Sequence, residues 1–411
     1  MTEINEELAS AFDPITPEFT ADQHKALREL REKCPVAHSS QFGGFWALTR
    51  RADVIEAASN HKQLINSVMH VVPGGLAGNS RPLLHSDQPE HTLYKNTIQT
   101  VLLSSRLKAD VVESVRAEAR KIIASILEKG EGDLVLDYGG PLMAHTIISI
   151  FGIEGVDPHE LDQIIHSYVV AGRVRNEADM KAANEKLENI AKALIADRTE
   201  HPRNPDDDLT TAILRDHVAG KLTDPAKVMG AVRQPFAIVW IATSHSLSNM
   251  FRRLLIDRGL QDTLRGESSL IADSVDEFLR MDQPQLGFAR TANSDLEIGG
   301  QRIREGDPVA LVFPVANRDP EVFEDPETFK IGRYPNPHLA FGAGIHSCPG
   351  KNIAREVVQV ALEELITGTG DFTLTIPVED IPNEYWPFRA SLSLPVRVAP
   401  PASACRPAGA A

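Results

Sequence analysis

The spacing of apolar residues along the chain predicts a protein that is mainly helical. Apolar side chains recur every three or four residues over long stretches, which is the period of a helix with one buried face. After a polar start over residues 1–20, which is expected to be irregular and flexible, this pattern predicts helices over 21–34, 51–60, 106–127, 142–151, 159–171, 177–199 and 209–218. Pro35 ends the first of them, because proline cannot continue a helix.

One further helix is predicted to lie in the core. Asp224 is a suitable N-cap, Pro225 suits the first helical position, and Gly259 is a suitable terminator. Between them, residues 236–243 read Phe-Ala-Ile-Val-Trp-Ile-Ala-Thr, which is too apolar on every side for a surface helix. Pro235 is expected to bend this helix, because proline removes a backbone donor and clashes with the preceding turn.

The remaining pattern predicts small sheets and one long loop. Glycine pairs with β-branched or aromatic residues predict strands over 43–49, 290–292, 296–304 and 308–313, with a Gly-Gly hairpin in the third segment. Residues 66–85 are rich in Gly, Pro and Val without a clear period, and long loops of this kind are usually functional or disordered. The expected fold class is therefore mainly α with small β-sheets (α+β).

Composition and charge narrow the function classes. The chain has 411 residues with 42 Lys plus Arg and 57 Asp plus Glu, a net charge of −15, which argues against nucleic acid or an anionic membrane as partner. Its three cysteines, Cys34, Cys348 and Cys405, form no C-x-x-C pair and no disulfide framework. The acidic N-terminus lacks a signal-peptide pattern, and no stretch approaches the ~18 apolar residues that span a bilayer. We expect a soluble protein of the reducing cytoplasm.

The most informative stretch is Phe341-Gly-Ala-Gly-Ile-His-Ser-Cys-Pro-Gly350, which opens a helix predicted over 351–368. Unpaired N–H groups and the positive dipole end at a helix start lower the pKa of a cysteine, and glycines let a flat cofactor approach the backbone. An isolated Gly-x-x-x-Cys would more often be a turn with a buried structural cysteine. The full order F-G-x-G-x-H-x-C-x-G, however, resembles the haem-binding loop of the cytochrome P-450 family. The resemblance implies that Cys348 is the axial iron ligand, with Phe341, Gly342 and Gly350 beside the haem.

Further residues match propionate contacts of that family. His91 and Lys95 lie four residues apart on one helix face, and the family uses a similar His-x-x-x-Arg to hold a haem propionate. Lysine carries a compact charge and lacks the two parallel hydrogen bonds that an arginine can donate. The alternative to a propionate contact is that His91 and Lys95 form a solvated pair on the surface. Arg290 and His346 match two further propionate contacts. The implied cofactor is haem b.

A third group of residues resembles a structural network of the family. Glu277 and Arg280 form its E-x-x-R motif, and Arg333 stands where a third network residue is expected. A buried network of this kind must be fully hydrogen-bonded or it destabilises the fold. The resemblance covers roughly residues 20–398 and implies one large haem-enclosing domain over 21–398, with the last hairpin of the fold over 386–396. The tail over 399–411 is rich in Pro and Ala and is expected to be disordered.

The central helix departs from the family pattern. In the family this helix carries an acid next to a threonine, and the pair delivers protons for oxygen activation. Counting back from Glu277 puts the threonine position at 242, give or take one, so the acid position is Trp240, Ile241 or Ala242, none of which is acidic. Thr243 is the candidate alcohol. His245 is a candidate proton donor, and a packed or solvent-facing histidine is the alternative.

The resemblance implies a haem-thiolate monooxygenase that inserts one oxygen atom from O2 into a C–H bond of a small to medium hydrophobic molecule, by hydroxylation or oxidative dealkylation. No flavin or nicotinamide module is present, so electrons are expected from a ferredoxin with its NAD(P)H-dependent ferredoxin reductase. These would dock near Cys348, where Arg106, Lys108 and Lys351 form either a basic patch or an ordinary mixed surface. The candidate substrate-pocket residues are Val72, Leu76, Val239, Phe288 and Trp386.

The missing acid leaves alternatives open. A peroxide-driven enzyme needs no electron partner and no usual proton relay, and such relatives carry an arginine and a proline on the central helix. Arg233 and Pro235 are present here, but about two turns too early. Oxidative coupling or rearrangement would also suit the altered helix. A non-catalytic haem ligand-binding protein is the remaining alternative, from a different functional class.

Overall fold

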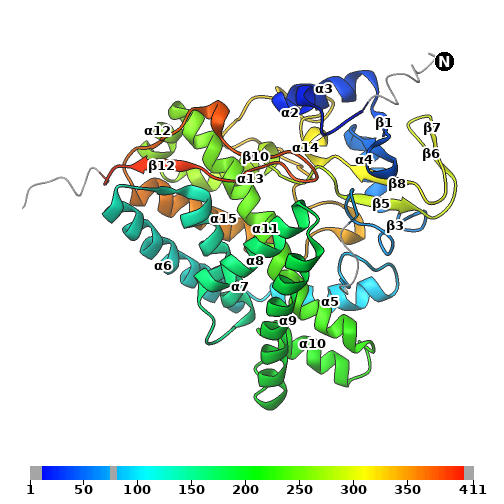
Figure 1. The fold of residues 1–411 in the computed structure, drawn as a ribbon, viewed down its shortest axis with the longest axis horizontal. Helices are drawn as coiled ribbons and strands as arrows, with labels where there is room; N and C mark the ends of the chain where they lie inside the picture. The colour runs from blue at the N-terminus through cyan, green and yellow to red at the C-terminus, as the bar shows by residue number, and fades with distance from the viewer. Residues whose placement is uncertain (1–11, 75–80, 402–411) are drawn as a thin grey trace, which may run out of the picture.

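Helix α11 (Pro225–Ile256) runs through the middle of the protein, as the computed structural model of residues 12–74 and 81–401 shows (Figure 1). Asp224 caps it by accepting the N–H groups of Ala226 and Lys227, and the helix continues through Pro235. It ends at Ile256, so the prediction that Gly259 terminates it was wrong. The physical reason is Asp257, which accepts the N–H of Leu260 and so starts a new helix, α12 (Arg258–Gly266).

The other helices follow the predicted pattern with small shifts. The predicted helix over 21–34 is confirmed and begins at Gln23, because Asp22 caps it by accepting the N–H of Lys25. A short helix over Pro17–Ala21 precedes it, although residues 1–20 were expected to be irregular; Thr16 caps this helix by accepting the N–H of Phe19. The helices are α2 (Pro17–Ala21), α3 (Gln23–Lys33), α4 (Arg51–Ser59), α5 (Glu90–Leu102), α6 (Ser105–Lys129), α7 (Gly140–Phe151), α8 (Pro158–Arg173), α9 (Glu177–Glu200), α10 (Leu209–Val218), α13 (Leu270–Met281), α14 (Phe313–Ala316) and α15 (Lys351–Gly368).

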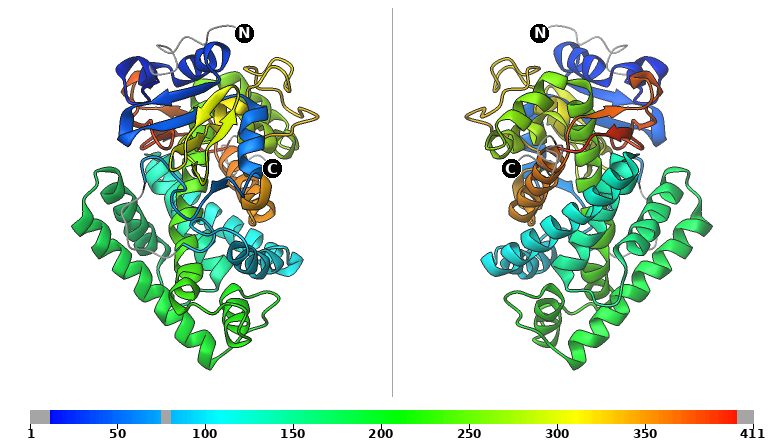
Figure 2. Two further views of the ribbon diagram at one scale, coloured as in Figure 1. Left: turned by 90° about the vertical axis from the view of Figure 1, so that its right-hand side faces the viewer. Right: turned by 90° about the vertical axis from the view of Figure 1, so that its left-hand side faces the viewer.

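A five-stranded sheet lies at one end of the protein, with α9 and α10 at the other (Figure 2). Its strand order is β1 (Val36–Ser39), β2 (Phe45–Leu48), β8 (Pro308–Leu311), β5 (Ala289–Ala292) and β3 (Leu64–Ile65). Strands β2 and β8 pair in parallel, and the other neighbours are antiparallel. This sheet places Arg290 of β5 next to the cavity described below.

Three smaller sheets complete the fold. The predicted Gly-Gly hairpin is confirmed, since β6 (Leu296–Ile298) and β7 (Gln301–Ile303) pair around Gly299 and Gly300, whose φ angles are 56° and 80°. β4 (Glu131–Asp133), β12 (Pro395–Val398) and β9 (Phe372–Leu374) form a second sheet. β10 (Asn383–Glu384) and β11 (Ala390–Ser391) form the third, so the predicted last hairpin starts three residues earlier than expected.

A large helical core surrounds α11, and two smaller cores lie against the five-stranded sheet. One stretch in the helical core, Leu134–Phe151, is long and apolar enough to cross a membrane by composition, although the sequence analysis expected none. In the structure 61% of it is buried inside the protein. It comprises a short π-helix (Leu134–Gly139) and α7, which pack against α6 and α11 as core elements.

Candidate active site

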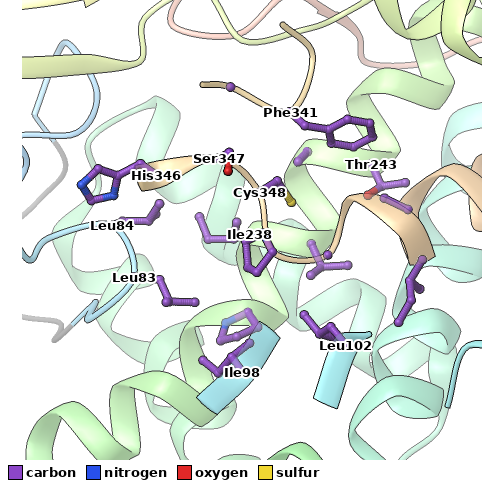
Figure 3. Close-up of a pocket in the computed structure, with 18 of the residues that line it drawn as sticks. Leu83, Leu84, Ile98, Leu102, Ile238, Thr243, Phe341, His346, Ser347 and Cys348 are labelled. Atoms are coloured by element: carbon purple, nitrogen blue, oxygen red, sulfur yellow. The ribbon is translucent and has the colours of Figure 1, made fainter. Parts of the chain in front are cut away.

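A cavity of about 310 Å³ lies between α11, α5, the start of α15 and the long loop that precedes α5 (Figure 3). It brings together residues that are far apart in the sequence. Every residue that the sequence analysis associated with haem lines it: His91, Lys95, Arg290, Phe341, Gly342, His346, Cys348 and Gly350. Most of the other lining side chains are apolar.

The loop that carries Cys348 depends on glycine at two positions. Gly342 and Gly344 have φ angles of 69° and 66°, a left-handed conformation that favours glycine. A Cβ on Gly344 would also lie 2.3 Å from the carbonyl oxygen of Ala58, so α4 packs directly on the loop. The N–H of Cys348 donates to the carbonyl of Phe341 across 2.8 Å, which closes the turn. These contacts fix the position of the Cys348 sulfur before α15 begins.

The surroundings of Cys348 act on its thiol in opposite directions. Burial raises the pKa of the Cys348 thiol, because a buried anion loses its hydration. The N–H of Gly350 and the ammonium groups of Lys95 and Lys351 lower it by less, so the pKa of the thiol lies above its ordinary value. The lowered pKa expected at a helix start is therefore not found, because burial outweighs these contacts. A bound metal cation would favour the thiolate further.

Unpaired donors gather at the edge of the cavity. The ring centroids of His91 and His346 lie 4.0 Å apart, and within the described part of the chain Nδ1 of His91 and both ring nitrogens of His346 have no hydrogen-bond partner. Burial lowers the pKa of His346 to about 2 and that of His91 to about 4. Arg290 has its pKa lowered to about 10 by burial, and it donates to the carbonyl of Ala289. Buried donors without acceptors suit an anionic ligand, so the residues present fit the two propionates of a haem.

Lys95 has a different set of contacts from the one expected. Its ammonium group donates to the carbonyl oxygens of Ile345 at 2.5 Å and Ser347 at 2.8 Å. It therefore holds the Cys348 loop against α5, although it also lines the cavity. The flexible stem and compact charge of lysine allow this contact, which a planar guanidinium would make less easily.

The face of α11 toward the cavity carries no acid. Val239, Ala242, Thr243 and Ser246 line the cavity, and no Asp or Glu is among the described lining residues. Of the three residues weighed for the acid position, Trp240 and Ile241 lie outside the lining, and Ala242 is inside it, next to Thr243.

His245 lies outside the cavity lining. It is buried, and its Nε2 accepts from Nη2 of Arg173 across 3.1 Å. Burial, with a smaller contribution from Arg173, lowers the pKa of His245 to about 3, so the ring is neutral near pH 7. The structure therefore separates His245 from Thr243, because the two side chains leave α11 in different directions.

The predicted substrate-pocket residues divide into two groups. Val239 and Phe288 line the cavity. Val72 is buried in a core beside the sheet, and Trp386 packs against the same core, so neither lines the cavity. Leu76 lies outside the described residues. The sequence analysis missed several lining residues: Asn66, His70, Leu83, Leu84, Gln234 and Ile238. Helical spacing from Ala242 back along α11 was the signal that could have found Ile238 and Gln234, which precede it by four and eight residues.

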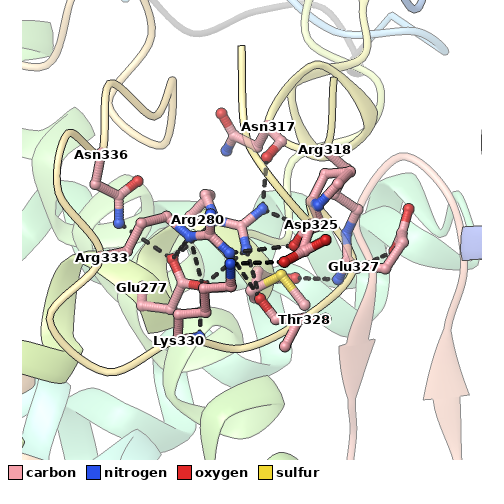
Figure 4. Close-up of polar contacts among 12 residues, drawn as sticks. Glu277, Arg280, Asn317, Arg318, Asp325, Glu327, Thr328, Lys330, Arg333 and Asn336 are labelled. Atoms are coloured by element: carbon pink, nitrogen blue, oxygen red, sulfur yellow. Dashed lines mark hydrogen bonds and ion pairs between the residues drawn. The ribbon is translucent and has the colours of Figure 1, made fainter. Parts of the chain in front are cut away.

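Glu277, Arg280 and Arg333 meet in a buried network (Figure 4). Arg280 binds both carboxylate oxygens of Glu277 at 2.8 Å, and Nε of Arg333 lies 3.0 and 3.1 Å from the same oxygens. The N–H of Lys330 and the side chain of Asn336 also donate to Glu277. The arginines donate their remaining N–H groups to backbone carbonyls, which ties α13 to the segment before the Cys348 loop.

The surface residues weighed as a basic patch are mostly paired with acids. Arg106 lies 3.9 Å from Asp110 and 3.7 Å from Asp207, and Lys108 lies 3.0 Å from Glu356. Lys351 is exposed at the start of α15. This surface is therefore mixed, with Lys351 as its cation nearest to Cys348 in the sequence.

Comparisons with known proteins agree with this site. A model of the family described as Cytochrome P450 matches residues 108–396. Nocardicin C N-oxygenase of Nocardia uniformis subsp. tsuyamanensis is 29% identical over 388 residues, covering 90% of this chain and 94% of that protein. Linalool 8-monooxygenase of Pseudomonas putida is 27% identical over 368 residues, covering 85% and 90%.

The fold comparison is consistent with the sequence comparison. The solved structure of cytochrome P450 CYP109Q5 from Chondromyces apiculatus matches with a TM-score of 0.84 and 23% identity, covering 96% of this chain and 99% of that one. The likeness shows that the two proteins share their fold. The family match spans more than half of this chain and includes both Cys348 and the Glu277 network. The chain therefore belongs to the cytochrome P450 family and is a bacterial-type monooxygenase with a haem-iron cofactor.

Proposed function

We propose that this protein is a cytoplasmic enzyme that inserts one oxygen atom from O2 into a C–H bond of a small to medium hydrophobic molecule, by hydroxylation or oxidative dealkylation. The observation that carries the proposal is that Cys348 and Thr243 line one cavity whose other walls are mostly apolar. Residues 21–398 form the catalytic domain in this proposal.

Haem b is the proposed cofactor, with Cys348 as its iron ligand. Arg290, His91 and His346 are the donors for its propionates, because their nitrogens are buried at the cavity and largely without acceptors. Phe341, Gly342 and Gly350 surround Cys348 with little bulk at the two glycines. When bound, the haem supplies the activation of O2, which a thiolate ligand favours.

Thr243 is the proposed group that holds and passes a proton, at its Oγ1 atom. The neighbouring Ala242 cannot do so, and the apolar side chains of Val239 and Phe288 keep bulk water away from the reacting substrate. Protons therefore reach Thr243 from ordered water or from a polar group of the substrate. His245 is left out of this route because it lies outside the cavity lining.

A ferredoxin with its NAD(P)H-dependent ferredoxin reductase is the proposed electron source. The exposed ammonium group of Lys351 precedes α15 close to Cys348 in the sequence, and it is a suitable contact for an acidic redox protein. The neighbouring Lys108 contributes less, because Glu356 already pairs with it.

Peroxide-driven chemistry is the second candidate, favoured by one observation. No carboxylate lines the described part of the cavity, and a reaction that starts from hydrogen peroxide needs no proton relay to split O2. Arg233 and Pro235 precede the Ala242–Thr243 pair by more than one turn of α11, so they do not stand beside it.

Turnover experiments separate the two candidates. Holoenzyme is screened with small hydrophobic compounds by the haem spin-state shift, and the compounds that bind are then incubated in two ways. Product that requires ferredoxin, reductase, NAD(P)H and O2 supports the first candidate, whereas efficient turnover with peroxide alone supports the second. Stoichiometric binding without product under both conditions would overturn both. A Cys348→Ser protein that kept the thiolate-type ferrous–CO spectrum would overturn the assignment of the iron ligand.

A further inference from the structure

A cluster of cationic and donor side chains lies beside the cavity. It adjoins one proposed propionate contact, because the carbonyl of His70 accepts the N–H of Ala289, the neighbour of Arg290. It comprises Arg81, which precedes α5, Tyr168 of α8 and Arg233 of α11, together with His70 and His85. Nη2 of Arg81 donates to the hydroxyl of Tyr168 across 3.1 Å, and the guanidinium carbon of Arg233 lies 5.3 Å from the centre of the same ring. Two positively charged groups therefore share one tyrosine.

Arg233 is buried without the partner that its charge requires. It is 4% exposed, and its Nε and Nη2 atoms make no hydrogen bond with any residue that the structure describes. Moving a guanidinium out of water is costly unless an anion or several acceptors replace the lost hydration. Elsewhere in this protein buried arginines meet this condition: Arg280 binds Glu277, and Arg198 binds Asp208.

Arg81 also has no ion pair with a carboxylate among the residues that the structure describes. Its Nη1 lies 3.5 Å from Nε2 of His70, and His70 contacts His85. Burial lowers the pKa of both histidines, so near pH 7 they are neutral neighbours that add no negative charge. The cluster therefore contains two guanidinium groups and no acid, and only an external anion would balance it.

One member of the cluster lines the cavity that also contains Cys348, and Arg81 and Arg233 lie behind this lining. His70 lines this cavity, and so does Gln234, the residue that follows Arg233. Gln234 is 4% exposed, and its Oε1 is buried without a partner, so a second polar side chain at this place lacks its hydrogen bond. Arg233 precedes Thr243 by ten residues, which is roughly 15 Å along a helix. A ligand that joins the two places must therefore be elongated.

We propose that the substrate is an elongated hydrophobic carboxylate, whose carboxylate group binds between Arg233 and Arg81 while its apolar part extends toward Thr243 and Cys348. This inference rests on the proposed monooxygenase function and adds the chemical class of its substrate. Arginine is suited to the task because its planar fork matches a carboxylate with two parallel hydrogen bonds. The haem propionates do not compete for this place, since their proposed donors are Arg290, His91 and His346.

Matched pairs of probes test the proposal on the holoenzyme. Dodecanoate is compared with dodecanol, and cinnamate with cinnamyl alcohol, by titration of the haem spin state and by calorimetry. We expect at least one acid to bind roughly 10- to 100-fold more tightly than its alcohol, the difference that one charge-assisted hydrogen-bonded pair provides. If neither acid binds more tightly than its alcohol, the proposal is overturned.

Substitutions locate the effect. Arg233→Gln should remove most of the preference for the acid, while the affinity for the alcohol stays within about 2-fold of that of the wild type. Arg233→Lys should restore part of the preference for the acid. Arg302→Gln is the matched control, because Arg302 is 77% exposed and pairs with Asp295 on a distant hairpin. An acid preference that survives in the Arg233→Gln protein, with its haem content unchanged, would overturn the proposal.

The binding readout does not depend on turnover. Loss of product formation in the wild-type enzyme, with the acid preference intact, would overturn the proposed reaction and leave the carboxylate site standing. Turnover of neutral compounds without any preference for the acids would overturn the carboxylate site and leave the proposed reaction standing.

Discussion

Trp240 donates its indole N–H to Asp162 across 2.7 Å, and this bond joins α11 to α8. Trp240 is 5% exposed and Asp162 is 8% exposed, so the pair is buried. A Cβ on Gly140 of α7 would lie 2.6 Å from Oδ1 of Asp162, so the three helices meet closely at this carboxylate. The bond directs Trp240 away from the cavity, which leaves Ala242 and Thr243 to face it.

Replacing Asp162 with asparagine should stabilise the protein at neutral pH. Burial raises the pKa of Asp162 to about 6 from an ordinary value of 3.8, so the folded protein binds this proton more firmly than the unfolded chain does. Stability from this group is therefore present at low pH and is lost as pH rises through the window between about 4 and 6. Asp162→Asn keeps the acceptor for Trp240 and is always neutral. We expect a gain of about 1–3 kcal/mol above pH 6, from about 1.4 kcal/mol per pKa unit.

Denaturant unfolding of the holoenzyme at several pH values measures this difference. Asp206→Asn, at an exposed position, serves as the control. A difference between the Asp162→Asn and wild-type proteins that stays constant across the window would contradict the raised pKa.

Gly344→Ala should destabilise the protein by more than the left-handed backbone angle of Gly344 alone would cause. Gly332 has a similar φ of 68° but open space around its Cβ position, whereas Gly344 faces the carbonyl of Ala58. Gly332→Ala is expected to cost about 1–2 kcal/mol through its φ alone. Gly344→Ala should cost a further ~1–3 kcal/mol, as overpacking does, with a lower haem content after purification. Equal losses of stability in the two variants would refute the close approach to α4.

Glu277→Gln should destabilise the protein strongly. The substitution leaves Arg280 and Arg333 buried without their carboxylate, and breaking a buried pair of this kind costs about 3–5 kcal/mol. Glu324→Gln is the matched control, because Glu324 is 89% exposed and its change should stay within about 0.5 kcal/mol. Thermal or denaturant unfolding measures both, and a small effect at Glu277 would show that the network is dispensable.

Lys95→Met should loosen the loop before Cys348. The change leaves the carbonyl groups of Ile345 and Ser347 without their ammonium donor, at a cost of about 1–3 kcal/mol. We expect faster transfer of haem to an acceptor protein, and partial recovery in Lys95→Arg, which restores the charge with a less suitable shape. Haem transfer as slow as in the wild type would argue that Lys95 has no role in holding this loop.

Local features could be predicted from the sequence. Helix spans followed from apolar periodicity, and the hairpin at Gly299 and Gly300 followed from the turn residues that it needs. Gly259 shows the limit of this reasoning, because two residues earlier Asp257 had already started the next helix.

The sequence alone determined the residues that carry the chemistry, because the order of Phe341, His346 and Cys348 and the spacing of Glu277 and Arg280 are properties of single short segments. The tertiary structure decided which side chains share the cavity. Val72 and Trp386 are as apolar as Val239 and Phe288, yet only the latter pair lines it. The rotation of α11 places Thr243 in the cavity lining and leaves Trp240 and His245 outside it, and that rotation is set by contacts with Asp162 and Arg173 on a different helix. Contacts between distant segments of this kind cannot be read from local periodicity.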